Sequence, residues 1–411
     1  MLEDTKVRAR PSWLLLGPAF VAAIAYVDPG NVAANVSAGA QYGFLLVWVI
    51  VVANVMAGLV QYLSAKLGLV TGRSLPEAVA DHTHTPTRVA FWLQAELVAM
   101  ATDLAEVVGG AIALYLLFDL PLLVGGLITG VVSLLLLAVQ NRRGQRVFER
   151  VITGLLMVIA IGFLTSLFVK TPPAAAVADG LIPRFDGAES ILLATAMLGA
   201  TVMPHAVYLH SGLARDRHGH AEGPRLRMLL RVTRFDVGLA MLVAGAVNMA
   251  MLLVAATNLQ GRGDTDSIEG AHAAVSDALG PTVALLFAIG LLASGFASTS
   301  VGCYAGSVVM AGLLQRRVPL LVRRLVTLAP ALLVLGAGAD PTAALVVSQV
   351  VLSFGIPFAL VPLVVLTSRR SVMGADVNHR ATTVVAAVVT ALVVAVNITL
   401  VAMVAITGEV P

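Results

Sequence analysis

The sequence has little charge and almost no cysteine. Only 12% of its 411 residues are charged, whereas an ordinary soluble domain has about 25%. So few charged side chains cannot cover a water-facing surface of this size, which excludes a soluble globular protein. The single cysteine, Cys303, excludes intramolecular disulfides and any iron–sulfur or metal site that is built from several cysteines.

Apolar residues, by contrast, make up 58% of the chain and fall into long blocks with few charges. A helix needs about 20 apolar residues to cross the hydrocarbon core of a bilayer. Eleven blocks reach this length, which predicts an all-α integral membrane protein with eleven transmembrane helices. The blocks lie near 13–38, 43–70, 88–118, 121–140, 148–170, 190–214, 233–257, 281–314, 322–338, 341–367 and 381–406.

The basic residues predict the orientation of these helices, because cytoplasmic loops of membrane proteins carry an excess of Lys and Arg. With the N-terminus in the cytoplasm and the C-terminus outside, all but three of the 26 Lys and Arg residues fall on the cytoplasmic side. Arg323 and Arg324 belong to that cytoplasmic set, in the connection before the ninth helix. The net charge of +3 is therefore an orientation signal in a cell-membrane protein. It indicates no nucleic-acid partner, and no obligate protein partner is evident beside the lipid bilayer.

The first predicted helix contains polar and helix-breaking residues at mid-depth, namely Asp28, Pro29, Gly30 and Asn31. Ionisable groups inside a membrane helix are costly and mark functional sites. Pro29 removes a backbone donor and Gly30 tolerates non-helical torsions, so the helix should be unwound here. Broken backbone occurs at this depth only where it is buried in protein or lines a watery cavity. A plain proline kink is the alternative, but a kink needs neither a carboxylate nor an amide beside it.

A second break is predicted in the sixth helix, where Met203 precedes Pro204 and His205. Helices 1–5 and 6–10 then carry interruptions at matching positions. Because five is an odd number, the second set of helices runs through the membrane in the opposite sense to the first. Paired interruptions in such inverted repeats mark a transport site near the bilayer midplane. The predicted organisation is one transporter domain over 1–411, with repeats at 13–170 and 190–367 and an additional helix at 381–406.

The two breaks offer a mixed set of metal ligands. Asp28 supplies a carboxylate, Asn31 an amide oxygen and Met203 a thioether. The helix ends at the breaks expose carbonyl groups, and Ala25 and Ala200 are placed to supply them. Oxygen ligands alone would suit Mg²⁺ or Ca²⁺, whereas a thioether favours a transition metal. Simple packing is the alternative for Met203, because most of the 13 methionines must serve that purpose.

Further ionisable residues are expected within the third and sixth helices. Glu96, Asp103 and Glu106 lie within an arc of about 80° on one face of the third helix. Such a row of carboxyl groups suggests a proton path, although structural pairing with buried polar groups is an equal alternative for Glu96. Together with Asp28, these are the acidic residues expected inside the membrane. His205 and His210 in the sixth helix either relay protons or fill a polar gap.

Three stretches of the chain resemble the signature segments of the Nramp family of divalent-metal transporters. They are Asp28-Pro29-Gly30-Asn31, Met203-Pro204-His205 and Ser348-Gln349-Val350-Val351-Leu352-Ser353. The resemblance implies a LeuT-like fold and proton-linked uptake of Mn²⁺ or Fe²⁺. Ala206 departs from the family pattern, because many members carry Asn there. This departure concerns a local polar contact and not the metal ligands.

The resemblance also implies roles for individual residues. Side-chain ligands of the metal would be Asp28, Asn31 and Met203. The carbonyls of Ala25 and Ala200 would add to them in particular conformations, and Gln349 would join when the site is occluded. Asp103 and Glu106 match the proton-pathway acids in the third helix of the family, and His205 and His210 match the histidines in its sixth helix.

The sequence therefore predicts a bacterial secondary active importer of Mn²⁺ or Fe²⁺ that works by alternating access, with H⁺ as the coupling ion. It is not expected to be an enzyme or to hold a cofactor other than this cargo. A proton- or sodium-coupled amino-acid transporter of the same architecture is the alternative, although Asp28 would repel a substrate carboxylate. An intramembrane metalloenzyme would need a three-ligand site with an activated water, and the sequence lacks His-Glu-x-x-His. A passive channel would need no titratable path.

Overall fold

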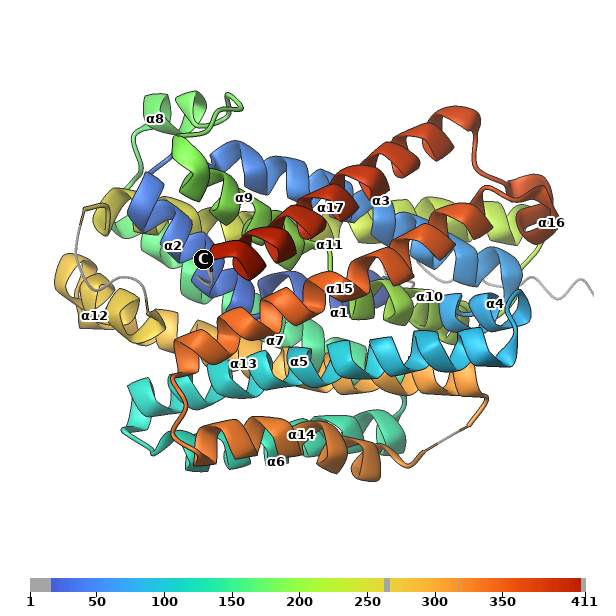
Figure 1. Cartoon of the computed structure of the whole chain (residues 1–411), viewed down its shortest axis with the longest axis horizontal. Helices are drawn as coiled ribbons and strands as arrows, with labels where there is room; N and C mark the ends of the chain where they lie inside the picture. The colour runs from blue at the N-terminus through green and yellow to red at the C-terminus, as the bar shows by residue number, and fades with distance from the viewer. Residues whose placement is uncertain (1–15, 262–266, 317, 408–411) are drawn as a thin grey trace, which may run out of the picture.

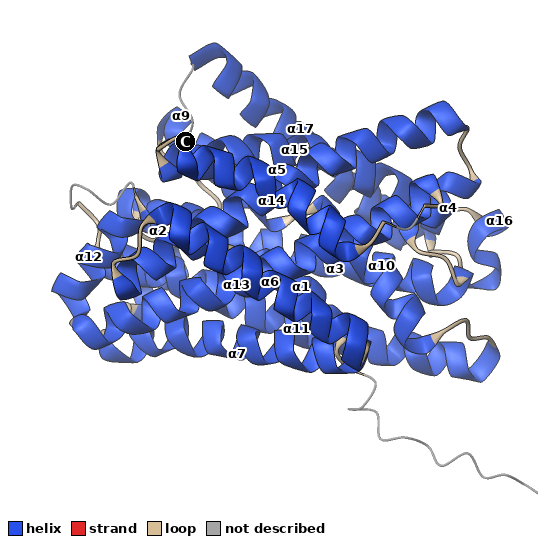
Figure 2. Cartoon of the chain, turned by 90° about the horizontal axis from the view of Figure 1, so that it is seen from below, coloured by secondary structure: helices blue, strands red, loops and turns tan. Residues whose placement is uncertain are grey.

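The protein is a bundle of long helices. The computed structural model describes residues 16–261, 267–316 and 318–407, and within these ranges it contains helices and loops but no strand (Figure 2). Most of the long helices run roughly along one direction, with shorter helices at the two ends of the bundle (Figure 1). The all-α prediction is confirmed.

Among the described residues, nine helical segments are long and apolar enough to cross a membrane. Each coincides with a predicted span. The segments are α3 (Val47–Thr71), α5 (Thr85–Phe118), α6 (Leu122–Arg143), α7 (Gln145–Val169), the run Gly187–His218, α11 (Gly223–Asn258), α13 (Pro281–Leu314), and parts of α15 (Pro341–Thr367) and α17 (Arg380–Thr407).

Two predicted spans fall short of this length. The first is divided into α1 (Pro18–Ala23), the 3₁₀ helix η2 (Ile24–Val27) and α2 (Pro29–Tyr42). The ninth is α14 (Leu320–Gly336), with 17 residues. At 1.5 Å per residue such a helix is about 26 Å long, slightly less than the hydrocarbon core of about 30 Å. Within the described residues, length and composition thus support nine crossings, and the count of eleven stays a prediction.

Short helices in the connections lie at both ends of the bundle. They are α4 (Leu75–Asp81), α8 (Ala174–Asp179), α12 (Ile268–Leu279), α16 (Arg370–Met373) and the 3₁₀ helix η3 (Gly374–Asp376). Figure 1 shows α4 and α16 at one end and α8 and α12 at the other. The sequence assigns α4 and α16 to the cytoplasmic side and α8 and α12 to the outside. The arrangement therefore agrees with the predicted alternation of the chain through the membrane.

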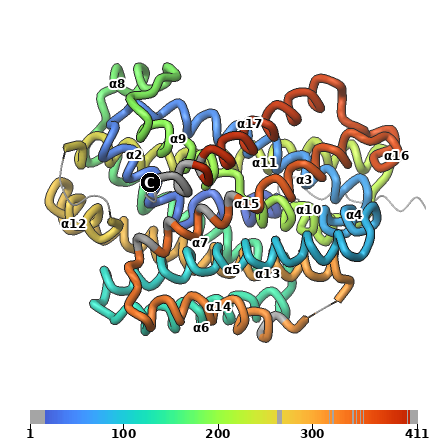
Figure 3. The backbone as a smooth tube through the Cα atoms, viewed as in Figure 1, coloured from blue at the N-terminus to red at the C-terminus, as the bar shows by residue number. Residues whose placement is uncertain are grey.

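The interior of the bundle is built on close approaches between helices. α5 and α13 pack along much of their length (Figure 3). They approach so closely that a Cβ at Gly295 would lie 2.8 Å from the Cα of Gly110. Glycine at these positions lets two backbones meet without side chains between them. This contact places α5, the third predicted span, directly against α13, the eighth. Both lie beside the broken first helix.

The outer helices expose large apolar side chains. Soluble proteins rarely expose contiguous apolar patches of more than a few hundred Å². On α6, α14 and α17, many such residues face outward, and lipid would cover them in a membrane. They include Leu127, Val131, Leu135, Leu325, Val326, Leu333, Val384, Val385, Val388 and Leu392.

Candidate transport site

The predicted break in the first helix is confirmed at Asp28. This residue has an extended backbone (φ −68°, ψ 167°), which separates η2 from α2. Its carboxylate oxygen Oδ1 accepts hydrogen bonds from the backbone N–H of Asn31 at 2.9 Å and from its Nδ2 at 2.6 Å. Asp28 is thus the N-cap of α2, and Pro29 occupies the first helical position, where a missing N–H costs nothing. Local sequence chemistry accounts for this break.

The sixth predicted helix is broken as well, between α9 (Gly187–Thr201) and α10 (Pro204–His218). Met203 is extended (φ −83°, ψ 125°) and 1% exposed. The two breaks meet, because Asn31 Nδ2 donates a second hydrogen bond to the carbonyl oxygen of Ala200 at 3.1 Å. Asp28, Asn31 and Ala200 therefore form one buried hydrogen-bonded group. Ligation by Met203 and by the Ala25 carbonyl stays a prediction.

Gln349 on α15 reaches the same place. A Cβ at Gly30 would overlap the amide of Gln349 and would lie 3.4 Å from Asp28 Oδ2. Glycine at position 30 therefore allows Gln349 to approach the break from a third direction. The site is therefore bordered by the first and sixth predicted spans, which carry the two breaks, and by the tenth, from which the family resemblance implied Gln349.

One carboxylate oxygen at this junction stands out. Asp28 Oδ2 is buried and has no hydrogen-bond partner among the described residues. A buried polar atom without a partner is expensive and calls for an explanation, such as a bound ion. No group of three or more His, Cys, Asp and Glu side chains in the described ranges is placed to hold a metal. A metal here would depend on amide, thioether and carbonyl ligands beside the single carboxylate.

The acidic row on α5 is divided between paired and unpaired groups. Asp103 accepts hydrogen bonds from Thr299 Oγ1 at 2.5 Å and from Arg324 Nη1. Glu96 forms an ion pair with Arg323 at 2.7 Å. Glu106 is fully buried, and within the described chain its carboxylate oxygens have no hydrogen-bond partner. For Glu96 the structure therefore contains the structural pairing that was the alternative to a proton role.

The assignment of Arg323 and Arg324 to a cytoplasmic connection needs correction. Both lie in the first turns of α14, and only 3% and 0% of their respective surfaces are exposed. Arg324 Nε also donates to Ser133 Oγ on α6 at 2.6 Å. A count of basic residues by side of the membrane cannot distinguish a loop arginine from one that folds back into the bundle. The sequence did contain a signal for their burial, because the two arginines are adjacent and lie in a block that is otherwise apolar.

The two histidines of α10 differ in their surroundings. His205 is buried, and neither ring nitrogen has a partner in the part of the chain that is described. His210 Nδ1 lies 2.7 Å from Gln61 Oε1, and Gln61 Nε2 donates to Tyr26 Oη at 2.5 Å. His210 is thus connected to the first break through Gln61 and Tyr26. Proton transfer by His205 or His210 stays a prediction.

Two buried acids were missing from the expected set. Asp236 on α11 accepts hydrogen bonds from the backbone N–H of Gly17 at 3.1 Å and of Ala19 at 3.0 Å. Glu149 on α7 lies 3.5 Å from Arg217 Nε at the end of α10. Both acids fall inside predicted spans, 233–257 and 148–170, so the sequence already contained the signal. Asp236 fastens the first turn of the short helix α1 to α11.

Replacement of Asp236 should therefore loosen α1. We expect Asp236→Ala to speed the labelling of a reporter, Val21→Cys, by at least threefold when an impermeant maleimide is applied on the α4 side. Native Cys303 is buried and should contribute little background. Asp277→Ala, an exposed position on α12, is the control and should leave the labelling rate unchanged. Equal rates in the two variants would show that Asp236 does not restrain α1.

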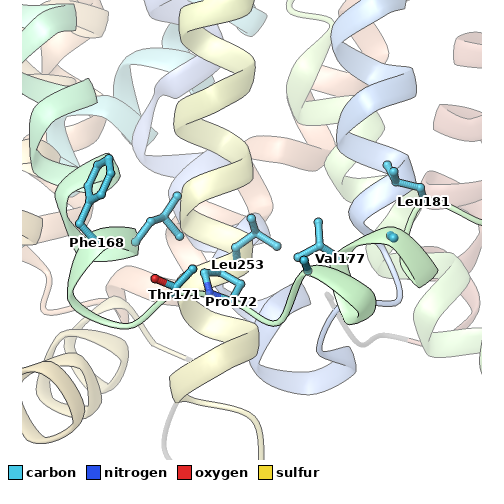
Figure 4. Close-up of a pocket in the computed structure, with 9 residues that line it drawn as sticks. Phe168, Thr171, Pro172, Val177, Leu181 and Leu253 are labelled. Atoms are coloured by element: carbon cyan, nitrogen blue, oxygen red, sulfur yellow. The ribbon is translucent and has the colours of Figure 1, made fainter.

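One pocket in the described part of the chain is lined by none of these residues. It has a volume of about 640 Å³ and is formed by the end of α7, by α8 with its flanking loop, and by α11 (Figure 4). Its walls are mostly apolar and include none of the predicted ligands. The lining residues are Leu167, Phe168, Thr171, Pro172, Ala174, Val177, Ala178, Leu181 and Leu253.

Comparison with known proteins identifies the family. The family model described as natural resistance-associated macrophage protein-like (Nramp) matches residues 19–403. The chain belongs to the Nramp family. It is 70% identical over 402 residues to the divalent metal cation transporter MntH of Mycobacterium tuberculosis, covering 98% of this chain and 94% of that protein. It is 46% identical to the MntH of Bacillus subtilis, covering 97% and 94%.

Solved structures agree with this assignment. A manganese transporter of Eremococcus coleocola matches with a TM-score of 0.86 and 31% identity, over 97% of this chain and 90% of that one. The fold extends to more distant transporters. The nucleobase-cation-symport transporter MHP1 matches with a TM-score of 0.60 at 13% identity, over 94% of this chain and 91% of that one. This likeness concerns the fold alone, and it agrees with the LeuT-like architecture that the resemblance implied.

Proposed function

We propose that this chain imports divalent transition-metal ions, Mn²⁺ or Fe²⁺, through the cell membrane together with protons. The observation that carries the proposal is the junction of the two breaks, where Asn31 joins Asp28 to the Ala200 carbonyl. A buried carboxylate oxygen faces this junction without a hydrogen-bond partner among the described residues. The names of the relatives support metal ions as the cargo.

The proposed ligand set follows from the atoms left available at the junction. The Asn31 amide nitrogen is used by Asp28 and Ala200, which leaves its oxygen for the ion. The Ala200 carbonyl accepts one hydrogen bond and keeps a second lone pair. Asp28 Oδ2, the Met203 sulfur and the Ala25 carbonyl complete the set, and Gln349 joins when the site closes. A thioether among oxygen ligands favours a transition metal over Mg²⁺ or Ca²⁺.

Proton coupling is proposed to begin at Asp28. A 2+ charge beside the carboxylate favours its ionised form, so arrival of the metal releases a proton. From Asp28 the proton passes to Glu106 on α5, a second buried carboxyl group without a hydrogen-bond partner in the described chain. Asp103, three residues before Glu106 on the same helix, is the next group of the proposed path. His205 and His210 are further candidates for the path. With the N-terminus in the cytoplasm and the C-terminus outside, movement of α1 would open the site inward and deliver the ion.

The geometry disfavours the amino-acid transporter alternative. A substrate carboxylate in such a transporter binds at the exposed N-terminus of a half-helix in the break. Here the carboxylate of Asp28 already caps the N-terminus of α2. A second carboxylate would meet like charge at the position where it needs free N–H groups.

Uptake into proteoliposomes tests the proposal directly. With an inward proton gradient, we expect the reconstituted chain to accumulate ⁵⁴Mn²⁺ and to acidify the lumen, because metal and proton enter together. Unlabelled Fe²⁺ should compete, and a mixture of amino acids should not. Amino-acid uptake that Mn²⁺ leaves unaffected would instead establish the alternative function.

The role of Met203 is tested by its effect on ion preference. We expect Met203→Ala to lower the preference for Mn²⁺ over Ca²⁺ by about tenfold, because the soft ligand is lost while the oxygen ligands remain. Competition of Ca²⁺ with ⁵⁴Mn²⁺ uptake measures this ratio. Met251 on α11 is an equally buried methionine, at 1% exposure. Met251→Ala therefore controls for the cavity that truncation of a buried methionine leaves. An unchanged ratio in Met203→Ala would assign Met203 to packing.

A further inference from the structure

The unwound part of the first helix leaves backbone carbonyls that need partners. Buried carbonyl groups are nearly always hydrogen-bonded, and at a break in a membrane helix other elements must supply the donors. Tyr26 and Val27, the last two residues before Asp28, are both completely buried. Their carbonyl oxygens accept hydrogen bonds from side chains on two other helices.

Asn248 of α11 connects the two halves of the broken helix. Its Nδ2 donates to the carbonyl oxygen of Tyr26, in η2, at 2.8 Å. Its Oδ1 accepts from Asn35 Nδ2, in α2, at 3.1 Å. One side chain, 5% exposed, thus touches the chain on both sides of Asp28. It restrains the direction of η2 relative to α2.

Ser294 of α13 holds the next carbonyl. Its Oγ donates to the carbonyl oxygen of Val27 at 2.6 Å, and its side chain is completely buried. A peptide group is planar, so fixing a carbonyl oxygen orients the whole group. Asn248 and Ser294 therefore orient the two consecutive peptide groups that lead to Asp28.

We infer that Asn248 and Ser294 are positioning residues of the metal site, which act by holding the carbonyls of Tyr26 and Val27. In this arrangement, the carbonyl of Ala25 on one side and the Asp28 carboxylate on the other keep a fixed separation. The inference rests on the proposed function, because it assigns Asn248 and Ser294 to the ion that Asp28 binds. Groups that orient metal ligands typically contribute a factor of about 10–100 in metal affinity.

The test is the Mn²⁺ affinity of the purified full-length chain, measured by calorimetry for Asn248→Ala and Ser294→Ala. We expect each variant to raise the Kd by about tenfold and to raise KM for uptake more than it lowers the maximal rate. Ser294→Thr keeps the hydroxyl and should retain the original affinity. A purely structural role would lower thermal stability without this separation of KM from the maximal rate.

Matched controls exist for both variants. Asn397 is 3% exposed and donates within its own helix, to the Val393 carbonyl at 2.6 Å. Ser300 lies on α13 with Ser294 and donates to the Phe296 carbonyl at 2.8 Å. Asn397→Ala and Ser300→Ala should change the Kd less than twofold. If the Asn248 and Ser294 variants behave like these controls, the inference is wrong.

A double-mutant cycle tests the connection across the break. If Asn248 links α2 to η2, Asn35→Ala and Asn248→Ala should be non-additive in their effect on the Kd, because both remove the same bridge. Additive effects would overturn the bridging role. Should Asn248→Ala fail to fold, the Ser294 variants decide the question alone. Failure of the proposed function is distinguishable, since the unaltered chain would then bind no Mn²⁺.

Discussion

Asp28→Ala is expected to abolish Mn²⁺ uptake, with at least a hundredfold loss of the initial rate in proteoliposomes. The substitution removes the only carboxylate in the proposed ligand set and also the group proposed to exchange a proton for the metal. The loss of the N-cap costs about 1 kcal/mol of stability, which a chain of this size should tolerate. The variant should therefore purify as a folded protein that does not transport.

Asp28→Asn separates the two roles of this side chain. An amide oxygen can still accept the hydrogen bond from the Asn31 N–H, so the cap is kept while the charge is lost. We expect thermal stability close to that of the unaltered chain and an Mn²⁺ uptake as low as that of Asp28→Ala. Uptake at the original rate in Asp28→Asn would contradict a role of the charge in binding and coupling.

The parts of the fold that the sequence predicted are those with a local cause. Pro29 and Gly30 interrupt the first helix by their own chemistry, and Pro204 begins α10 because its missing N–H is harmless there. Long apolar runs likewise need only their own length to predict a span. The same reasoning accounts for the nine helical segments among the described residues that are long and apolar enough to cross a membrane.

The parts that the sequence did not predict depend on contacts between distant segments. Asp236 lies more than 200 residues from Gly17, whose N–H it accepts. The partner of Asp103 is Arg324, which is separated from it by 221 residues. No period or motif in a single sequence relates such positions. The assignment of basic residues to the two sides of the membrane placed Arg324 in a cytoplasmic connection, although it is completely buried.

The ion pair of Arg324 and Asp103 gives the second large expected effect. Removing one partner of a buried pair leaves an uncompensated charge and typically costs about 3–5 kcal/mol. We therefore expect Arg324→Leu to lower the free energy of unfolding by about that amount, as measured by denaturation in detergent micelles. Glu96 is 13% exposed at its side chain, so Arg323→Leu should have a smaller effect through its own ion pair.

The double variant Arg324→Leu/Asp103→Leu separates stability from transport. Replacing both charges removes the uncompensated carboxylate, and such replacements are often neutral or stabilising. We expect the double variant to be more stable than Arg324→Leu alone. If Asp103 carries protons, the double variant should also lose lumen acidification during Mn²⁺ uptake, although its fold is restored. A double variant no more stable than Arg324→Leu would mean that the pair contributes little, and intact acidification would remove Asp103 from the proton path.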